Sequence, residues 1–209
     1  MNTATFAWRG LDDPHRFDIV RADFDGDTCT AGGASVTLDY ELTWHLDVGD
    51  GWRTRSLRVE RRSRSGARTR LELERSPDGT WSGGHTEMDT RHRSPLPAET
   101  LRLLGGSLDC DLGKCPFTNF MPIRRIVRDG PTGVWVSHTM AWVKVPSLEV
   151  VPIAQQYMVT KVGREGATAL YRGATNKVHE LTTDADHVVL DYPFLAERVP
   201  PIRVASAKS

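Results

Sequence analysis

The sequence predicts a mainly β protein that forms a single domain over residues 1–209. Two observations support this prediction. About ten to thirteen short segments with strand patterns are separated by turn residues, and one segment alone has a helical pattern. A series of short strands of this kind is typical of a sandwich, an open barrel or a curved half-barrel.

The first half of the chain carries the clearest strand signals. In residues 36–44, five apolar side chains alternate with polar ones, so one face of this segment is expected to be buried. Residues 52–62 and 70–75 are two further predicted strands. The dipeptide Asp78-Gly79 predicts a tight hairpin turn that leads into the next strand at Trp81.

The one predicted helix covers residues 97–104 and ends at Gly105-Gly106. The second half then returns to strand patterns. These predicted strands are residues 122–128, 133–145, 155–162, 168–172, 177–183 and 188–192. The polar end of the chain, residues 199–209, is expected to form a flexible tail.

Composition limits the classes of function. The 27 basic residues equal the 27 acidic ones, whereas a general nucleic-acid-binding protein usually has a basic excess. No segment has the apolar core of a signal peptide or the length of a membrane-spanning helix. Three cysteines are too few and odd in number for a disulfide framework. We therefore expect a cytoplasmic protein that binds no nucleic acid and has no transmembrane segment.

The densest group of polar residues lies between positions 109 and 125. Its carboxylates are two residues apart, so both leave the same face of an extended strand, and two prolines bracket a Thr-Asn pair. The two arginines alternate across the predicted strand 122–128, so one faces the carboxylates and the other faces solvent. These groups form either a polar clamp for a ligand or an internal salt-bridge network, and residue types alone favour the network. The candidate residues here are Asp109, Asp111, Thr118, Asn119, Arg124 and Arg125.

An enzymatic alternative uses Asp109 or Asp111 as an acid or base in sugar or glycolipid metabolism. Same-face neighbours on a strand lie roughly 6–7 Å apart, but both approach a substrate from the same side. We therefore predict no catalytic residues. Cys110 and Cys115 have four residues between them, and the seven histidines are scattered, so we predict neither a metal site nor a cofactor.

A second alternative is an RNA-binding or acidic-partner module. Eight arginines lie between Arg53 and Arg70, next to Trp52. The same pattern is typical of a hairpin with a charged outer face, neutralised here by nearby glutamates. The zero net charge of the chain favours the hairpin interpretation.

The sequence contains six tryptophans, all in or next to predicted strands. They would form either a packed core or the lining of an amphipathic pocket, since indole presents an apolar face and one hydrogen-bond donor. The sequence leaves these two possibilities open.

Several motifs resemble those of the putative glycolipid-binding family of bacteria. The motifs are D-x-D at 109–111, P-x-T-N at 116–119, P-I-R-R at 122–125, and a P-x-L…Q-x-Y segment that includes Gln156 and Tyr157. The resemblance implies a strongly curved, mainly antiparallel sheet that forms an unclosed half-barrel with at most one or two short helices. It also implies an amphipathic ligand such as a lipid or glycolipid, held on the concave face, and adds Gln156 and Tyr157 to the candidate ligand-binding residues.

Overall fold

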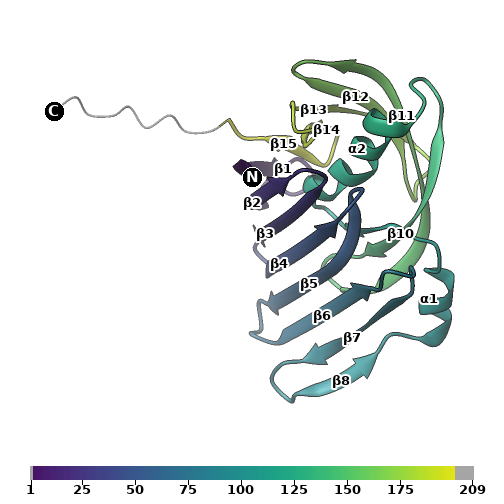
Figure 1. Cartoon of the computed structure of the whole chain (residues 1–209). Helices are drawn as coiled ribbons and strands as arrows, with labels where there is room; N and C mark the ends of the chain where they lie inside the picture. Colours follow the sequence, from purple (N-terminus) through teal and green to yellow (C-terminus); the bar gives the residue numbers. More distant parts are fainter. Residues whose placement is uncertain (1, 201–209) are drawn as a thin grey trace.

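A computed structural model describes residues 2–200 as one strongly curved sheet that carries two α-helices and a 3₁₀ turn (Figure 1). The helical segments are α1 (Ala98–Leu103), η1 (Pro116–Asn119) and α2 (Phe120–Asp129). The strands are β1 (Asn2–Gly10), β2 (Phe17–Asp25), β3 (Thr28–Val36), β4 (Tyr40–Gly49), β5 (Arg53–Ser63), β6 (Arg68–Arg75), β7 (Trp81–Glu87), β8 (His92–Pro95), β9 (Asp109–Leu112), β10 (Val136–Val143), β11 (Val150–Gly163), β12 (Gly166–Arg172), β13 (Val178–Thr183), β14 (Val189–Tyr192) and β15 (Ala196–Arg198). No helix in this part of the chain is long and apolar enough to cross a membrane.

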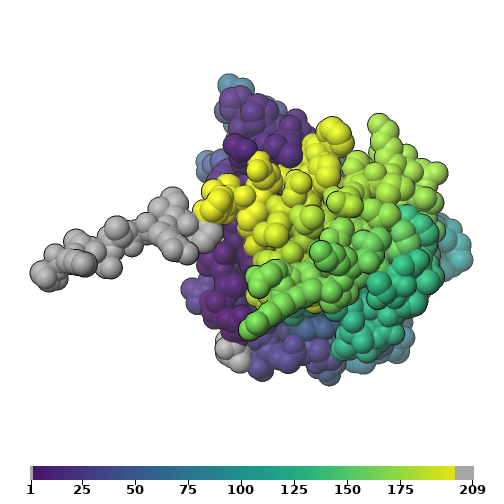
Figure 2. All heavy atoms as spheres, turned by 90° about the horizontal axis from the view of Figure 1, so that it is seen from above, coloured from purple at the N-terminus to yellow at the C-terminus, as the bar shows by residue number. Residues whose placement is uncertain are grey.

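The sheet is a half-barrel. Its strands follow the order β8-β7-β6-β5-β4-β3-β2-β1-β15-β14-β13-β12-β11-β10-β9. β15 pairs with β1, so the C-terminal strands lie between the N-terminal strands and β11–β13 (Figure 2). β8 and β9 are the two edges and do not pair with each other, so the sheet is not closed into a barrel. The predicted fold class is confirmed.

The connection between β9 and β10 contains the segment that was predicted as a strand but is helical. These two strands are parallel, whereas the other neighbouring pairs are antiparallel. Parallel neighbours need a crossover, and η1 and α2 provide it. Residues 122–128, predicted as a strand, are therefore helical. Pro122 fits within the first turn of α2 because backbone N–H groups there have no acceptor inside the helix.

The crossover lies on the concave face of the sheet (Figure 1), and its aromatic side chains Phe117 and Phe120 belong to the hydrophobic core. The ring centroid of Phe117 lies 4.8 Å from that of Phe120, 5.8 Å from that of Phe6 and 5.9 Å from that of Trp44. Four of the six tryptophans are buried, namely Trp8, Trp44, Trp52 and Trp81. These four side chains therefore belong to the packed core.

The remaining predictions agree with the structure in part. The predicted turn before Trp81 is confirmed, and Gly79 has the positive φ of 92° that a side chain would disfavour. The predicted helix is α1. Residues 36–44 are not one strand, because the chain turns after Val36 and Leu38 is exposed. The described residues contain fifteen strands rather than ten to thirteen, and β10 is shorter than residues 133–145.

The predicted flexible tail is described only at its start. The backbone N–H of Val199 donates a 2.8 Å hydrogen bond to the carbonyl of Ala7. Residues 201–209 lie outside the described part of the chain.

Candidate functional site

The two aspartates of β9 have different partners. Asp109 is 1% exposed, and its carboxylate accepts hydrogen bonds from both terminal nitrogens of Arg125, with a distance of 2.7 Å from Nη1 to Oδ1. Arg125 also donates to the carbonyl of Trp52. This buried ion pair joins β9 to α2, so Asp109 and Arg125 have the internal salt-bridge role that their residue types favoured.

Arg124 is also internal, although one of the two arginines was expected to face solvent. Its guanidinium carbon lies 4.3 Å from the ring centroid of Phe24 and 4.2 Å from that of Trp52. Its Nε donates a 2.7 Å hydrogen bond to the carbonyl of Asp186. Burial lowers the pKa of Arg124. The expectation fails because the segment is helical, and Arg124 and Arg125 both reach backbone carbonyl acceptors, those of Asp186 and Trp52.

Asp111 is the centre of a separate hydrogen-bond network. Its Oδ1 accepts a 2.8 Å bond from the hydroxyl of Thr118, and its Oδ2 accepts a 2.6 Å bond from Nε2 of Gln155. The hydroxyl of Tyr157 lies 2.8 Å from Oδ1 of Asn119 and 3.0 Å from Oε1 of Gln155. The structure thus brings together four of the predicted residues, from β9, η1 and β11.

The Tyr157 hydroxyl has one proton but faces two amide oxygens, so it donates to only one of them at a time. Burial raises the pKa of Tyr157 well above its ordinary value, which keeps the hydroxyl protonated. Turning the Gln155 amide would relieve this contact but would direct Oε1 at the carboxylate of Asp111. An ionised Asp111 carboxylate therefore favours the present orientation of the Gln155 amide.

Gln156 lies on the other face of β11. Successive side chains of a strand point to opposite faces, and Gln156 accepts a 3.2 Å hydrogen bond from Arg172 instead. Gln155, which the sequence reasoning missed, shares a face with Tyr157. Its spacing of two residues from that tyrosine was the available signal.

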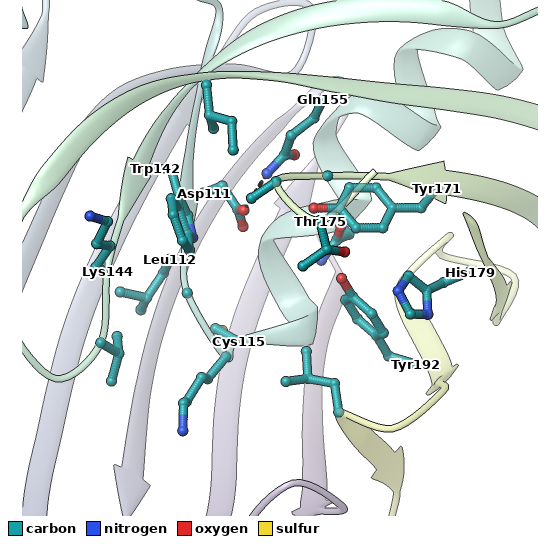
Figure 3. Close-up of a pocket in the computed structure, with 18 of the residues that line it drawn as sticks. Asp111, Leu112, Cys115, Trp142, Lys144, Gln155, Tyr171, Thr175, His179 and Tyr192 are labelled. Atoms are coloured by element: carbon teal, nitrogen blue, oxygen red, sulfur yellow. Dashed lines mark hydrogen bonds between the residues drawn. The ribbon is translucent and has the colours of Figure 1, made fainter. Parts of the chain in front are cut away.

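A cavity of about 540 Å³ opens above this network on the concave side of the sheet (Figure 3). Asp111, Asn119 and Gln155 form its floor. Its walls carry the aromatic side chains of Trp142, Tyr171, His179 and Tyr192. These wall residues come from β10, β12, β13 and β14, and none of them is among the candidate ligand-binding residues predicted from the motifs.

The Asp111 carboxylate is the main electrostatic feature of the cavity. Burial raises its pKa, while the hydrogen bonds from Gln155 and Thr118 act in the opposite direction. No lysine, arginine or histidine of residues 2–200 forms an ion pair with it. Burial also raises the pKa of Cys115, so the thiol in the wall stays protonated. Residues 2–200 contain no group of three or more metal-ligating side chains.

The arginine-rich stretch lies away from this cavity, on β5, β6 and the turn between them. Five of its eight arginines form ion pairs with acidic residues. Arg58 pairs with Glu72 at 3.0 Å and Arg70 pairs with Glu60 at 2.7 Å, across neighbouring strands. These contacts are those of a hairpin with a neutralised outer face.

Comparisons with known proteins give two matches. A family profile described as "Putative glycolipid-binding" matches residues 5–198. The chain is also similar to a DUF1089 family protein from Pseudomonas aeruginosa, known from a crystal structure, with 23% identity and a TM-score of 0.67. That similarity covers 87% of this chain and 92% of the other, and it shows a shared fold. No curated protein matches.

Proposed function

Since the chain belongs to the putative glycolipid-binding family, we propose that it binds an amphipathic ligand such as a glycolipid, with the polar head group in the cavity above Asp111. The volume of about 540 Å³ lies within the range of roughly 300–1,000 Å³ that is typical of small-molecule sites. The observation that carries the proposal is the combination of an acceptor-rich floor with aromatic walls.

A sugar matches this combination chemically. Its hydroxyl groups can donate to the oxygens of Asp111, Asn119 and Gln155, while its apolar C–H faces can lie against the rings of Trp142 and Tyr192. In small-molecule sites of this kind, a few polar groups at fixed positions set the orientation of the bound ligand and give the site its specificity.

The charge distribution favours a head group with neutral hydroxyls at the floor over one with a phosphate. The carboxylate of Asp111 has only the neutral donors Thr118 and Gln155, so it would repel an anion. The two lysines at the rim are already paired. Lys114 lies 3.2 Å from Asp12, and Lys144 lies 2.9 Å from Glu149.

A second candidate function is acid–base catalysis on the same ligand by Asp111. A buried carboxyl with a raised pKa in a cavity is typical of a general acid or base. Glycoside hydrolysis commonly needs two carboxylates that flank the bond. Among the described residues that line the cavity, Asp111 is the only carboxylate, and Asp109 is held by Arg125. We therefore favour binding over hydrolysis.

Native mass spectrometry with a panel of glycolipids and phospholipids tests this proposal. We expect a one-to-one glycolipid complex with the wild type and with Gln156→Ala, and its loss in Gln155→Ala. The two variants remove the same side chain from adjacent positions, so Gln156→Ala controls for the substitution itself. Equal binding by both variants, or exclusive binding of phospholipids, would contradict the proposal. Conversion of the glycolipid during incubation would instead support the catalytic candidate.

A further inference from the structure

The carboxylate of Asp111 has no counter-ion among residues 2–200. Its two hydrogen-bond donors, Thr118 and Gln155, are neutral. The neighbouring carboxylate on β9, Asp109, is instead neutralised by Arg125. A carboxylate that is taken out of water without a positive partner is unfavourable, so a cation that enters the cavity would be attracted to Asp111.

The other charges around the cavity are balanced within the protein. Lys114 lies 3.2 Å from Asp12, and Lys144 lies 2.9 Å from Glu149. Each lysine at the rim therefore has its own acidic partner. The one charge of the cavity that is left over is negative and lies at the floor.

Asp111 also has acceptor capacity left for a ligand. Its side chain is only half-buried and lines the cavity. Two carboxylate oxygens offer about four positions for hydrogen-bond donors, and Thr118 and Gln155 occupy two of them. An ammonium group carries three donors and a positive charge, and hydrogen bonds between ionised groups are roughly twice as strong as those between neutral groups.

The aromatic walls favour a cation in the same place. In Figure 3 the Trp142 ring is seen edge-on, with Lys144 on one side of it and Asp111 on the other. The Nζ atom of Lys144 lies 5.8 Å from the centre of that ring, so one face of Trp142 already contacts a cation. Across the cavity from Trp142 are Tyr171 and Tyr192, whose ring centroids are 5.7 Å apart. Aromatic rings attract an ammonium group within about 6 Å of their centres.

Three kinds of head group would differ in how well they fit these features. A phosphate would be repelled by Asp111. A neutral sugar would form hydrogen bonds with the floor but would leave the carboxylate without a counter-ion. A sugar that carries an amino group would supply both the hydrogen bonds and the missing positive charge.

We propose that the head group is an amino sugar, whose ammonium group binds Asp111 between the aromatic walls. Its remaining hydroxyls then bind the amide oxygens of Asn119 and Gln155, and its ring lies against Trp142. This inference rests on the proposed function, because it names the class of sugar that the same cavity takes.

Calorimetric titrations at pH 7 with four octyl compounds separate the contributions of the sugar and the amine. The compounds are octyl glucoside, its 2-amino-2-deoxy and 6-amino-6-deoxy derivatives, and octylamine. We expect one of the two aminoglucosides to bind about tenfold or more tightly than octyl glucoside, and octylamine to bind more weakly than that aminoglucoside. In Asp111→Asn this advantage of the aminoglucoside should disappear. Gln156→Ala, a change on the opposite face of β11, should retain it.

A second comparison tests the aromatic wall. Trp142→Leu should reduce the preference for the aminoglucoside over octyl glucoside about three- to fivefold, and Trp142→Phe should restore part of it. Trp135→Leu is the matched control. Trp135 also has a cation over its ring, Arg172 at 4.8 Å, but it does not line the cavity. Equal effects of Trp142→Leu and Trp135→Leu, or no effect of either, would overturn the placement of the ammonium group beside Trp142.

The outcomes distinguish this inference from the proposed function. Aminoglucosides that bind no more tightly than octyl glucoside, with octyl glucoside binding lost in Gln155→Ala, would overturn the amino sugar and leave the proposed function intact. Octylamine that binds as tightly as the aminoglucosides would overturn the amino sugar in favour of a simple amine. Binding of none of the glucosides would overturn both.

Discussion

The substitution Asp111→Asn tests whether the buried carboxylate of Asp111 contributes to ligand binding while lowering the stability of the fold. Burial raises the pKa of Asp111 in the folded protein above the unfolded value of about 3.9. The folded state therefore binds this proton more tightly than the unfolded state does. The contribution of Asp111 to stability is fully present below the unfolded pKa and is lost as the pH rises to the raised folded pKa.

The asparagine can keep the network intact without the charge. Its Oδ1 still accepts from Thr118, and its new NH₂ group can donate to Gln155 once that amide turns by 180°. The turned amide then donates to Tyr157, whose hydroxyl no longer faces two acceptors. The substitution thus removes a buried charge and one unfavourable contact together.

We expect a stability gain of about 1 kcal/mol at pH 7, or about 2–4 °C in Tm for a chain of this size. Thermal unfolding followed by circular dichroism between pH 3.5 and 8 measures it. The two proteins should have similar Tm values at pH 3.5 and diverge as the pH increases. Ligand binding should weaken, because the charged acceptor is lost. Parallel curves at every pH, or a lower Tm for Asp111→Asn at pH 7, would refute this account of Asp111.

Three further predictions concern the surroundings of the cavity. Asp109→Asn should lower the free energy of unfolding, measured by chemical denaturation, by about 3–5 kcal/mol, since it leaves Arg125 buried without its partner. A decrease below about 1 kcal/mol would contradict this role of Asp109. Gly173→Ala should leave the fold intact but lower the affinity for glycolipid about fivefold, as measured by calorimetry. The reason is that a Cβ at this position would lie 2.2 Å from the Tyr171 hydroxyl and would displace that side chain in the cavity. An unchanged affinity would show that Tyr171 does not contribute to the site. Burial raises the pKa values of Cys29 and Cys110 to about 12, and it also raises the pKa of Cys115. A thiol reagent at pH 8 should therefore react slowly with the native protein and rapidly with three thiols after denaturation; fast labelling of the native protein would contradict their burial.

Local patterns in the sequence predicted most of the sheet. Alternation and turn residues are short-range signals, and they identified most of the strands from Tyr40 onward. They failed at α2, where β-branched and proline content resembled a strand. The helical period was nevertheless present, since Phe120, Ile123 and Ile126 are buried at intervals of three residues.

The candidate site was harder to predict because distant strands form it. The D-x-D and P-x-T-N motifs correctly brought Asp111, Thr118 and Asn119 together, and these residues are close in sequence. The aromatic walls come from strands whose arrangement depends on the whole sheet order. The choice between Gln155 and Gln156 depended on which of them shares a face of β11 with Tyr157, and the spacing of two residues between Gln155 and Tyr157 was the available signal.

The most direct test of the central claim is NMR observation of side-chain amides during titration with the glycolipid that native mass spectrometry selects. The NH₂ signals of Gln155 and Asn119 should shift in a saturable way, because both amides lie at the floor of the cavity. The NH₂ signals of Gln156, on the opposite face of the same strand, should stay unchanged. Shifts at Gln156 without shifts at Gln155 and Asn119, or no glycolipid selected at all, would contradict head-group binding above Asp111.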